Sequence, residues 1–516
     1  MKSRKVLQGG QTTHRKVTPG RVVLAALLPL AACSANPEPI LVPPPPAPSA
    51  APTASVAQAT DPLGERPAVP EPPPFMAPTP ELFDGPGGSK IWLLERHGLP
   101  LLSVVAVTPH GASADGALPG RAHLVADMLD EGTDKLDAVA FSRAIEDLGA
   151  QLDSHADREK STVSLQVLSG KLPEALALLG AAITRPRHAE ADWKRASALW
   201  KNALKARGDD PATVARLVTS AALWGADHPY GQPAEGTTES ARKLTLKDVA
   251  RWHQAQWHPK NVTFVVVGDI GRGRLEDELN KAFDAWKKAP PQVEIKTPFP
   301  APPVAPRTVL VDRPDAPQVV LTVARRSASS SNPELPLLEL ANVALGGSFT
   351  SRLNQNLRED HGWTYGARSL FSGMRSGGLF LARASIRTDA IELALRETLA
   401  ELKKMADGGP SDEELTKIKA LARADAVDTY SSLQGIAATL ASHAAQGLPP
   451  DHDARALSAQ SAATREALLP LARRAFSPED ATILLVGPRK PIEAALKANG
   501  LPPPEERDAE GRPARR

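Results

Sequence analysis

The sequence predicts an α+β fold made of two similar domains in tandem. Strand-like and helix-like runs alternate from about residue 81 to residue 501 of the 516-residue chain, which is long enough for at least two domains. A Pro-rich break around 289–307 interrupts this alternation. After the break a strand pair again comes first and a short buried strand comes last, so the two halves read as a diverged internal repeat.

The first half begins with two β-rich runs, "KIWLLERHG" and "LLSVVAVTP", which a turn at Gly98-Leu99-Pro100 separates. "LPGRAHLVADMLDEGT" has the apolar spacing of a helix, and Gly132 is its stop signal. "STVSLQVLS" alternates like a half-buried strand, and "NVTFVVVGD" is a continuous apolar run typical of a buried strand. Further helices are expected in "DAVAFSRAIEDLGAQL", "KLPEALALLGAAIT", "EADWKRASALWKNALKARG" and "TLKDVARWHQAQW", the last capped by Thr245.

The second half repeats this order of elements. "RTVLVDRP" and "QVVLTVARR" are strand-like, "PELPLLELANVALGG" is helical, and "GGLFLARASI" is again a strand. Two long helices follow, of which "SDEELTKIKALARADAVDTY" has an acidic first turn that suits the helix dipole. "DATILLVG" closes this half as "NVTFVVVGD" closes the first. The predicted domains are therefore 81–288 and 307–501, joined by a linker over 289–306.

Residues 1–33 have the layout of a secretory signal. Basic residues without any acidic residue precede "VVLAALLPLAA", which is shorter than the ~20 apolar residues that span a bilayer. "LAAC", ending at Cys33, resembles a bacterial lipobox, which implies cleavage before Cys33 and its lipidation; the alternative is an ordinary signal peptide with an unrelated cysteine. Ser34 is not the residue for inner-membrane retention. The expected location is therefore the cell envelope, lipid-anchored in the outer membrane and facing the periplasm.

Low-complexity segments flank the two domains. The Pro/Ala-rich residues 34–80 are expected to form a disordered, extended tether, and 502–516 a disordered tail. Cys33 is the single cysteine, which excludes disulfides and Cys-based metal sites. The net charge of +2 and the 4% aromatic content argue against a nucleic-acid partner.

Four stretches of the chain resemble the pitrilysin/insulinase family of zinc metallopeptidases. "LLERHGLPLLSVVAV" is similar to the family's opening hairpin, and "HLVADMLDEGT" stands where the family has H-x-x-E-H. "LWGADHPYGQPAEGTTESARKLTLKDVARWHQAQWHPKNVTFVVVGDI" and "LGGSFTSRLNQNLREDHGWTYGARS" are similar to the family's most recognisable later segments. The resemblance implies two homologous domains, each an antiparallel-rich sheet covered by helices, that fold like a clam shell.

The zinc chemistry of this family needs residues that the sequence lacks. Two histidines at i and i+4 share a helix face and hold the metal, and a glutamate between them acts as general base. By the resemblance, His123 stands at the first ligand position, Ala126 at the general base and Asp127 at the second ligand. The third ligand, a distant glutamate, would stand near Ala203, on a helix without any carboxylate. The prediction is a degenerate motif without metal, in which His123 and Asp127 form a hydrogen-bonding pair.

The resemblance also implies two substrate-binding residues, Arg358 and Tyr365, in "LREDHGWTYGA". A guanidinium can hold a peptide carbonyl, and a phenol can stabilise a developing oxyanion. The alternative is structural: Arg358 pairs with a carboxylate and Tyr365 packs with its hydroxyl on the backbone. The other histidines examined, namely His228, His253, His258 and His361, are expected to be structural or solvent-facing.

Some bacterial members of this family are heterodimers, in which one subunit carries H-x-x-E-H and the other the Arg/Tyr pair. The pattern here resembles the second kind, which implies a non-catalytic subunit. It would have no cofactor of its own and would lend Arg358 and Tyr365 to a homologous partner that carries zinc, with a peptide as substrate. One alternative is a structural or peptide-binding pseudopeptidase of an envelope complex, like the core proteins of the cytochrome bc1 complex. Another is an active metalloendopeptidase with an atypical site.

Overall fold

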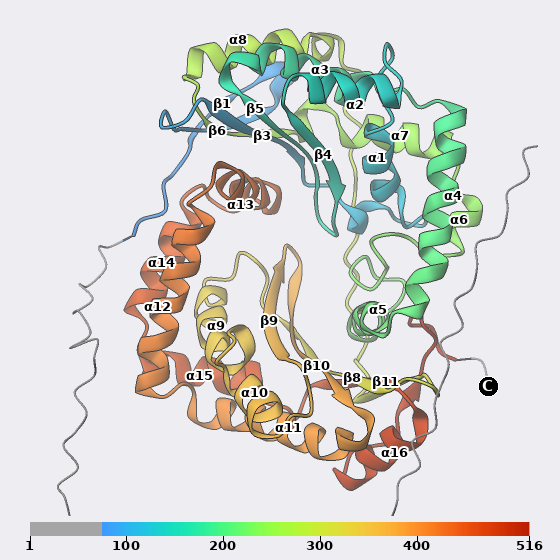
Figure 1. Ribbon diagram of the computed structural model, residues 1–516, viewed down its shortest axis with the longest axis vertical. Coiled ribbons are helices and arrows are strands. Elements are labelled where there is room, and N and C mark those ends of the chain that lie inside the picture. Colours follow the sequence, from blue (N-terminus) through green and yellow to red (C-terminus); the bar gives the residue numbers. More distant parts are fainter. Residues whose placement is uncertain (1–74, 515–516) are drawn as a thin grey trace, which may run out of the picture. The chain divides into compact units, whose positions relative to one another are not determined.

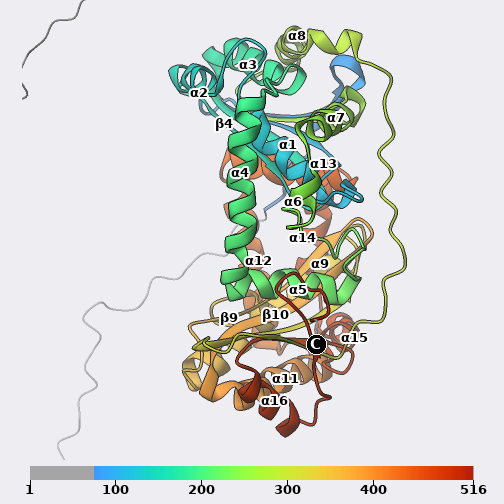
Figure 2. The ribbon, with the colours of Figure 1, turned by 90° about the vertical axis from the view of Figure 1, so that its right-hand side faces the viewer.

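The computed structural model describes residues 75–514 of the chain, and Pro73–Arg516 forms one compact unit (Figures 1 and 2). The described residues build two six-stranded sheets, each packed with helices, which confirms the α+β class. The first sheet contains β1 (Glu81–Asp84), β2 (Lys90–Glu95), β3 (Leu101–Thr108), β4 (Gln151–Ala156), β5 (Ser161–Leu168) and β6 (Thr263–Gly268). The second contains β7 (Thr308–Asp312), β8 (Gln318–Ser327), β9 (Ala367–Met374), β10 (Gly377–Arg387), β11 (Thr482–Gly487) and β12 (Glu505–Glu506).

The helices fall into two groups along the chain. Those before the second sheet are α1 (Arg121–Leu129), α2 (Ala138–Asp147), α3 (Leu172–Thr184), α4 (Glu190–Ala206), α5 (Pro211–Trp224), α6 (Ser240–Lys243), α7 (Leu246–Gln256) and α8 (Arg272–Ala282). The others are α9 (Leu335–Asn342), α10 (Arg352–Asn354), α11 (Ile391–Gly408), α12 (Asp412–Thr429), α13 (Leu433–Gln446), α14 (His452–Ala462), α15 (Arg465–Phe476) and α16 (Arg489–Ala498).

Five strands of the two sheets have the same topology. The strand orders are β1-β2-β6-β3-β5-β4 and β12-β7-β11-β8-β10-β9, and only the edge strands differ, because β1 is antiparallel to β2 whereas β12 is parallel to β7. β6 lies parallel to β2 and antiparallel to β3, and β11 is placed in the same way between β7 and β8. The expected opening hairpin is therefore wrong: β2 and β3 do not pair, because the last long strand of each half inserts between the first two.

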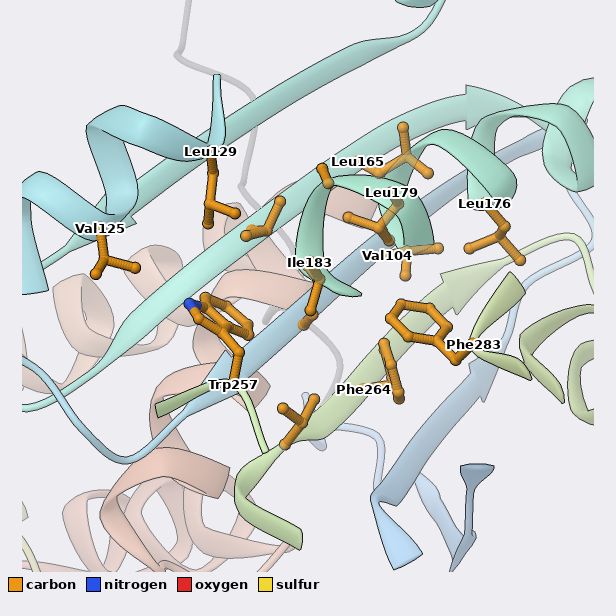
Figure 3. Close-up of a cluster of buried hydrophobic side chains, with 14 of the residues drawn as sticks. Val104, Val125, Leu129, Leu165, Leu176, Leu179, Ile183, Trp257, Phe264 and Phe283 are labelled. Atoms are coloured by element: carbon orange, nitrogen blue, oxygen red, sulfur yellow. The ribbon is translucent and has the colours of Figure 1, made fainter. Parts of the chain in front are cut away.

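A large apolar core covers one face of the first sheet. Ile91, Val104 and Phe264 point from the strands into this core, where side chains of α1, α3, α4, α7 and α8 meet them. Figure 3 shows part of this cluster, with Leu176, Leu179 and Ile183 of α3 over the strands and Phe283 against Phe264. Because successive strand residues point to opposite faces, Trp92, Val105 and Val265 face the other side.

Each sheet receives on its second face a helix from the other half of the chain. α13, which belongs to the C-terminal half, packs Ile436 and Leu440 against that second face of the first sheet (Figure 1). In return α5, from the N-terminal half, packs Val214 and Val218 against β11 and β8 of the second sheet. Both central strands are thus buried on both faces, which explains why β6 and β11 read as continuous apolar runs. The main core of the second sheet lies on its other face, under α9, α11, α15 and α16.

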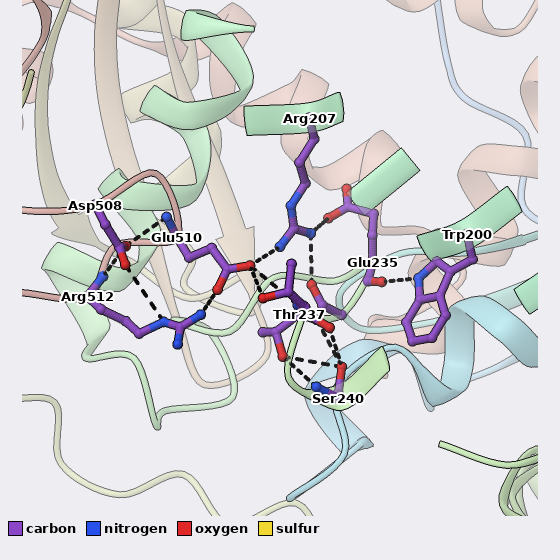
Figure 4. A network of polar contacts seen from close by, with 10 residues as sticks. Trp200, Arg207, Glu235, Thr237, Ser240, Asp508, Glu510 and Arg512 are labelled. Atoms are coloured by element: carbon purple, nitrogen blue, oxygen red, sulfur yellow. Dashed lines mark hydrogen bonds and ion pairs between the residues drawn. The ribbon is translucent and has the colours of Figure 1, made fainter. Parts of the chain in front are cut away.

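The C-terminal tail is ordered, so the prediction of a disordered 502–516 is wrong for its described residues. β12 adds to the open edge of β7, where unpaired backbone groups would otherwise face solvent. Glu510 then reaches back to the N-terminal half: it accepts a hydrogen bond from Thr238 Oγ1 at 3.0 Å and lies 3.6 Å from the guanidinium of Arg207. Figure 4 shows this network, in which Arg512 also pairs with Glu510.

Part of the predicted tether also packs on the domain. Ala77 is buried and Phe75 contacts Tyr430, with 5.8 Å between their ring centroids, so 75–80 belong to the folded unit. The predicted signal 1–33, with Cys33, and most of the tether lie outside the described residues. No described helix combines the length and apolarity that a membrane span requires.

Candidate functional site

Helix α1 carries the degenerate motif, and buried polar contacts fix its start. The Asp115 carboxylate accepts hydrogen bonds from the backbone amides of Gly120 at 2.7 Å and Ala122 at 2.9 Å. These two amides belong to the group of N–H donors that a helix start leaves unsatisfied, so Asp115 acts as a cap from outside the helix. Leu124, Val125 and Met128 bury the apolar face of α1 in the main core.

His123 and Asp127 lie side by side on the exposed face of α1. Their Nε2 and Oδ2 atoms are 3.5 Å apart, and the two side chains are 31% and 40% exposed. Burial raises the pKa of the Asp127 carboxyl, while the charges of His123 and His155 oppose this shift. The two side chains are thus within ion-pair distance, and the hydrogen bond between them stays a prediction.

Ala126 is almost completely buried. It is 4% exposed and packs with Ala122 of the same helix and Ala156 of β4 in a small alanine cluster. Ser154, also on β4, donates a hydrogen bond from its hydroxyl to the Ala126 carbonyl at 2.5 Å. The strand therefore lies close against the helix at the position where the family has its general base.

The third ligand position also lacks a side chain that could bind a metal, because it is occupied by Ala203. α4 packs beside α1, burying Trp200 and Leu204, but Ala203 lies on its exposed side. Within the described residues, His123 and Asp127 do not belong to any group of three side chains with metal-ligand atoms close together. The residues present thus do not fit a catalytic zinc, because they offer one imidazole, one carboxylate and no base.

Other acidic side chains lie near this pair and are not part of the H-x-x-E-H motif. Burial raises the pKa of Asp130 to about 6; the hydrogen bond from Ser154, 3.3 Å away, opposes the shift and the charge of Asp153 adds to it. Glu131 pairs with Arg195 of α4. These carboxylates follow the motif directly in sequence, but only the packing of β4 and α4 on α1 brings them together.

Arg358 and Tyr365 lie on the surface of the C-terminal half. Arg358 is in a short π-helical turn, Gln355–Asp360, where its guanidinium stacks 4.5 Å from the ring centroid of Phe349 and its Nε lies 3.4 Å from Glu359. Tyr365 is 92% exposed and Phe349 is 65% exposed. The structure thus contains the carboxylate contact of the structural alternative for Arg358. It does not contain the packed tyrosine of that alternative.

The other histidines have individual local contacts. His228 stacks on Trp224, with ring centroids 5.1 Å apart, and His258 lies 3.0 Å from the Pro290 carbonyl. His253 is buried beside His188, and His361 stacks in parallel on Trp363 at 4.1 Å. A further group, His443, His452 and Asp453, is not singled out by the sequence, because its members come from two helices on either side of a turn.

Comparisons with known proteins agree with this arrangement. The insulinase (peptidase family M16) model matches residues 108–237, and the model described as "peptidase M16 inactive domain" matches 243–421. Together they cover more than half of the chain. A protein of Streptomyces coelicolor named "uncharacterized zinc protease" is 26% identical over 312 residues, which are 58% of this chain and 66% of that protein. One from Bacillus subtilis with the same description is 23% identical, over 57% of this chain and 70% of its own length.

Solved structures show the same fold. A peptidase M16 inactive domain from Pseudomonas fluorescens superposes with a TM-score of 0.74 at 24% identity, covering 79% of this chain and 98% of its own. A protease from Helicobacter pylori superposes with a TM-score of 0.72 at 19% identity, covering 80% of this chain and all of that one. With both family models matched in order and this fold over four-fifths of its length, the chain is a member of the insulinase (M16) family of metallopeptidases.

Proposed function

We propose that this chain is a non-catalytic M16 subunit that lends Arg358 and Tyr365 to the active site of a homologous, zinc-bearing partner. The observation that carries the proposal is a contrast between two parts of one chain. On α1 the general-base position is a buried alanine, whereas Tyr365 of the Arg/Tyr motif is 92% exposed and makes no packing contact that would explain it. The general-base position of the motif is occupied by alanine, whereas the phenol of Tyr365 stays exposed to solvent.

The local structure around Arg358 suits this role. Stacking on Phe349 holds the guanidinium plane, so that its remaining N–H groups are available to a peptide carbonyl with little further loss of side-chain freedom. Exposed aromatic rings next to an arginine are the side chains that protein interfaces favour. In a closed complex the Tyr365 hydroxyl would donate a hydrogen bond to negative charge that develops on the peptide carbonyl oxygen, and zinc held by the partner would supply the activated water.

A cavity of about 440 Å³ between the two halves is a candidate place for part of a peptide. Residues from the β4–β5 turn, α5, β9 and β10 line it, among them Arg158, Arg216 and Leu370. Its lining combines apolar surface with charged groups, as peptide and ligand sites do. The peptide substrate itself is part of the proposal.

We also propose an envelope location for this subunit. Cleavage of the signal peptide before Cys33 and lipidation of that cysteine, which the Pro/Ala-rich tether follows, would keep the domain near the periplasmic face of the outer membrane. Globomycin, which blocks lipoprotein signal cleavage, should then cause a larger precursor to accumulate. Cys33→Ala should release the protein from the membrane fraction, and an unchanged distribution would contradict the anchor.

The proposal is tested by co-expression with a relative that has an intact H-x-x-E-H motif. Peptide cleavage is measured for the complex, for each chain alone, and for complexes carrying Arg358→Ala or Tyr365→Phe. Loss of a transition-state donor should lower kcat by about 10²-fold, and the partner alone should be nearly inactive. Arg368→Ala is the matched control, since this arginine is exposed on the neighbouring β9 but outside the motif.

Each alternative function gives a different result in this assay. If a complex forms and its activity is the same with Arg358→Ala and Tyr365→Phe, the lending model is wrong and a structural role is favoured. If the isolated chain cleaves peptides with zinc and His123→Ala abolishes that activity, the chain is an atypical peptidase in its own right.

A further inference from the structure

Two histidines and an aspartate converge at the junction of α13 and α14. His443 comes from the last turn of α13, whereas His452 and Asp453 open α14. Gly447, with φ of 71°, ends α13 and allows the chain to reverse within a few residues. One possible ligand atom from each of the three side chains lies within 4.8 Å of the others, and this is the only such group among residues 75–514.

The one ligand-atom distance given for this group suits a metal site as well as it suits an ion pair. Two ligands bound to zinc at about 2.0–2.1 Å with a tetrahedral angle lie roughly 3.3 Å apart. His443 Nε2 and Asp453 Oδ1 are already 3.2 Å apart. The ring centroids of His443 and His452 are 5.0 Å apart at an angle of 64°, which places the second imidazole beside this pair.

One member of the group is oriented by a neighbouring side chain, and another has a ring nitrogen without a hydrogen-bond partner. The Tyr430 hydroxyl donates to Asp453 Oδ2 at 2.7 Å, which orients the carboxylate in the way that outer partners orient metal ligands. His443 is 8% exposed, yet its Nδ1 has no hydrogen-bond partner. A buried polar nitrogen without a partner is costly. Since Nε2 is the ring nitrogen that lies against Asp453, Nδ1 would be the nitrogen left for an outer partner and not the atom that binds the ion.

These side chains line a cavity of about 510 Å³ between α9, α12, α13 and α14. Glu339 of α9 lines the same space, and its carboxylate is a further group that could bind a metal ion. Three protein ligands leave one position of a tetrahedral ion open, and here that position would face the cavity. The cavity is large enough for a small anionic ligand or the end of a side chain.

We propose that His443, His452 and Asp453 form a binding site for a divalent transition-metal cation, with zinc as the best fit to the donor set. Two imidazoles and one carboxylate are ligands that zinc accepts, whereas calcium and magnesium prefer oxygen donors alone. The site is separate from the degenerate motif on α1 and does not depend on the partner-lending function.

The test measures Zn²⁺ binding to the full chain after treatment with a chelator. Titration calorimetry should give about one zinc per chain with micromolar or tighter affinity, and Co²⁺ should give the visible absorption of a tetrahedral site. His452→Ala and Asp453→Asn should each weaken binding by about 100-fold or more, and Tyr430→Phe by about tenfold. His123→Ala is the matched control, because it removes the histidine of the other His/Asp pair, and it should leave binding unchanged.

Folding is checked separately in each variant. His443 is buried and its removal can disturb α13, but His452 and Asp453 are only half-buried, so their variants should keep the circular dichroism of the parent. No stoichiometric zinc, or equal affinity in the parent and in folded His452→Ala and Asp453→Asn, would overturn the proposal. Loss of binding in His123→Ala would also overturn it, because the metal would then belong to α1.

Discussion

The hydroxyl of Tyr230 donates a hydrogen bond to the Glu159 carboxylate at 2.5 Å, and together these two residues hold the turn between β9 and β10. The backbone amide of Arg375 donates to both carboxylate oxygens of Glu159, at 3.0 Å each. The amide of Ser376 donates to the Tyr230 hydroxyl, also at 3.0 Å. Since Glu159 and Tyr230 belong to the N-terminal half and the turn to the C-terminal half, these contacts fasten the two halves to each other.

Tyr230→Phe should therefore loosen the contact between the halves. The change leaves the Ser376 amide without a partner and removes one of the hydrogen bonds to the buried Glu159 carboxylate, which costs about 1–3 kcal/mol of the free energy of unfolding. Urea unfolding should measure this loss, and hydrogen exchange should become faster in the β9–β10 turn. Tyr365→Phe is the control: its ring is 92% exposed, so the change should stay within about 0.5 kcal/mol. Equal stability of the two variants would contradict the role of Tyr230.

The ordered tail predicts that Glu510 contributes to stability. The side chain of Arg207 is only 10% exposed, and Glu510 is one of its two carboxylate partners. Glu510→Ala also removes the acceptor for Thr238, so we expect a loss of about 1–2 kcal/mol in urea unfolding. Glu239→Ala should cost less than about 0.5 kcal/mol, because the Glu239–Lys243 pair is 61% exposed on both sides. If Glu510→Ala leaves the free energy of unfolding unchanged, the contacts of Glu510 do not contribute to stability and the prediction is wrong.

Local patterns in the sequence were sufficient for the central strands and most helices. β6 and β11 have apolar side chains on both faces because helices cover both faces of the sheet there. Such continuous apolar runs are easy to recognise in a sequence. β4 and β9 are outer strands with polar residues on one side, and they were not predicted. Nor could chain order show that β6 inserts between β2 and β3, because strand pairing is non-local.

The candidate site, too, could be predicted from the sequence only in part. The identities of Ala126 and Asp127 were enough to predict that the motif is degenerate, since an alanine cannot accept a proton. The approach of β4 that closes the space around Ala126 depends on Ala156, 30 positions away, and no local pattern reveals it. The His443, His452 and Asp453 group was missed for a similar reason: its geometry arises from a turn between two helices, whose exact bend the sequence does not specify.

The buried imidazole of His253 predicts a loss of stability in mild acid. Burial, aided by the charge of His188, lowers the pKa of His253 to about 3 in the folded chain. Between pH 3 and about 6.5 the unfolded chain therefore binds a proton that the folded chain does not, so unfolding becomes easier as the pH falls through this window. The free energy of unfolding should fall by up to about 1.4 kcal/mol per pH unit from this group.

Replacement of this histidine gives the measurement. His253→Gln should flatten the fall in unfolding free energy between pH 6.5 and 4, as followed by urea unfolding at several pH values. His361→Gln should leave the pH dependence as it is, because His361 is exposed and stacks only on Trp363. If His253→Gln retains the full acid sensitivity, other groups such as His188, whose pKa burial also lowers, are responsible.

Restoring the motif should fail for a packing reason. Ala126→Glu places a carboxylate in the alanine cluster against Ala156, where the present side chain is 4% exposed, and should cost about 2–4 kcal/mol of the free energy of unfolding. Ala203→Glu adds the same group on the exposed side of α4 and should be nearly neutral. With Asp127→His added to both, the triple variant should still lack peptidase activity, because β4 closes the space that the general base needs. A stable triple variant that binds zinc and cleaves peptides would show instead that only side-chain identity, and not the packing of β4 on α1, separates this chain from its active relatives.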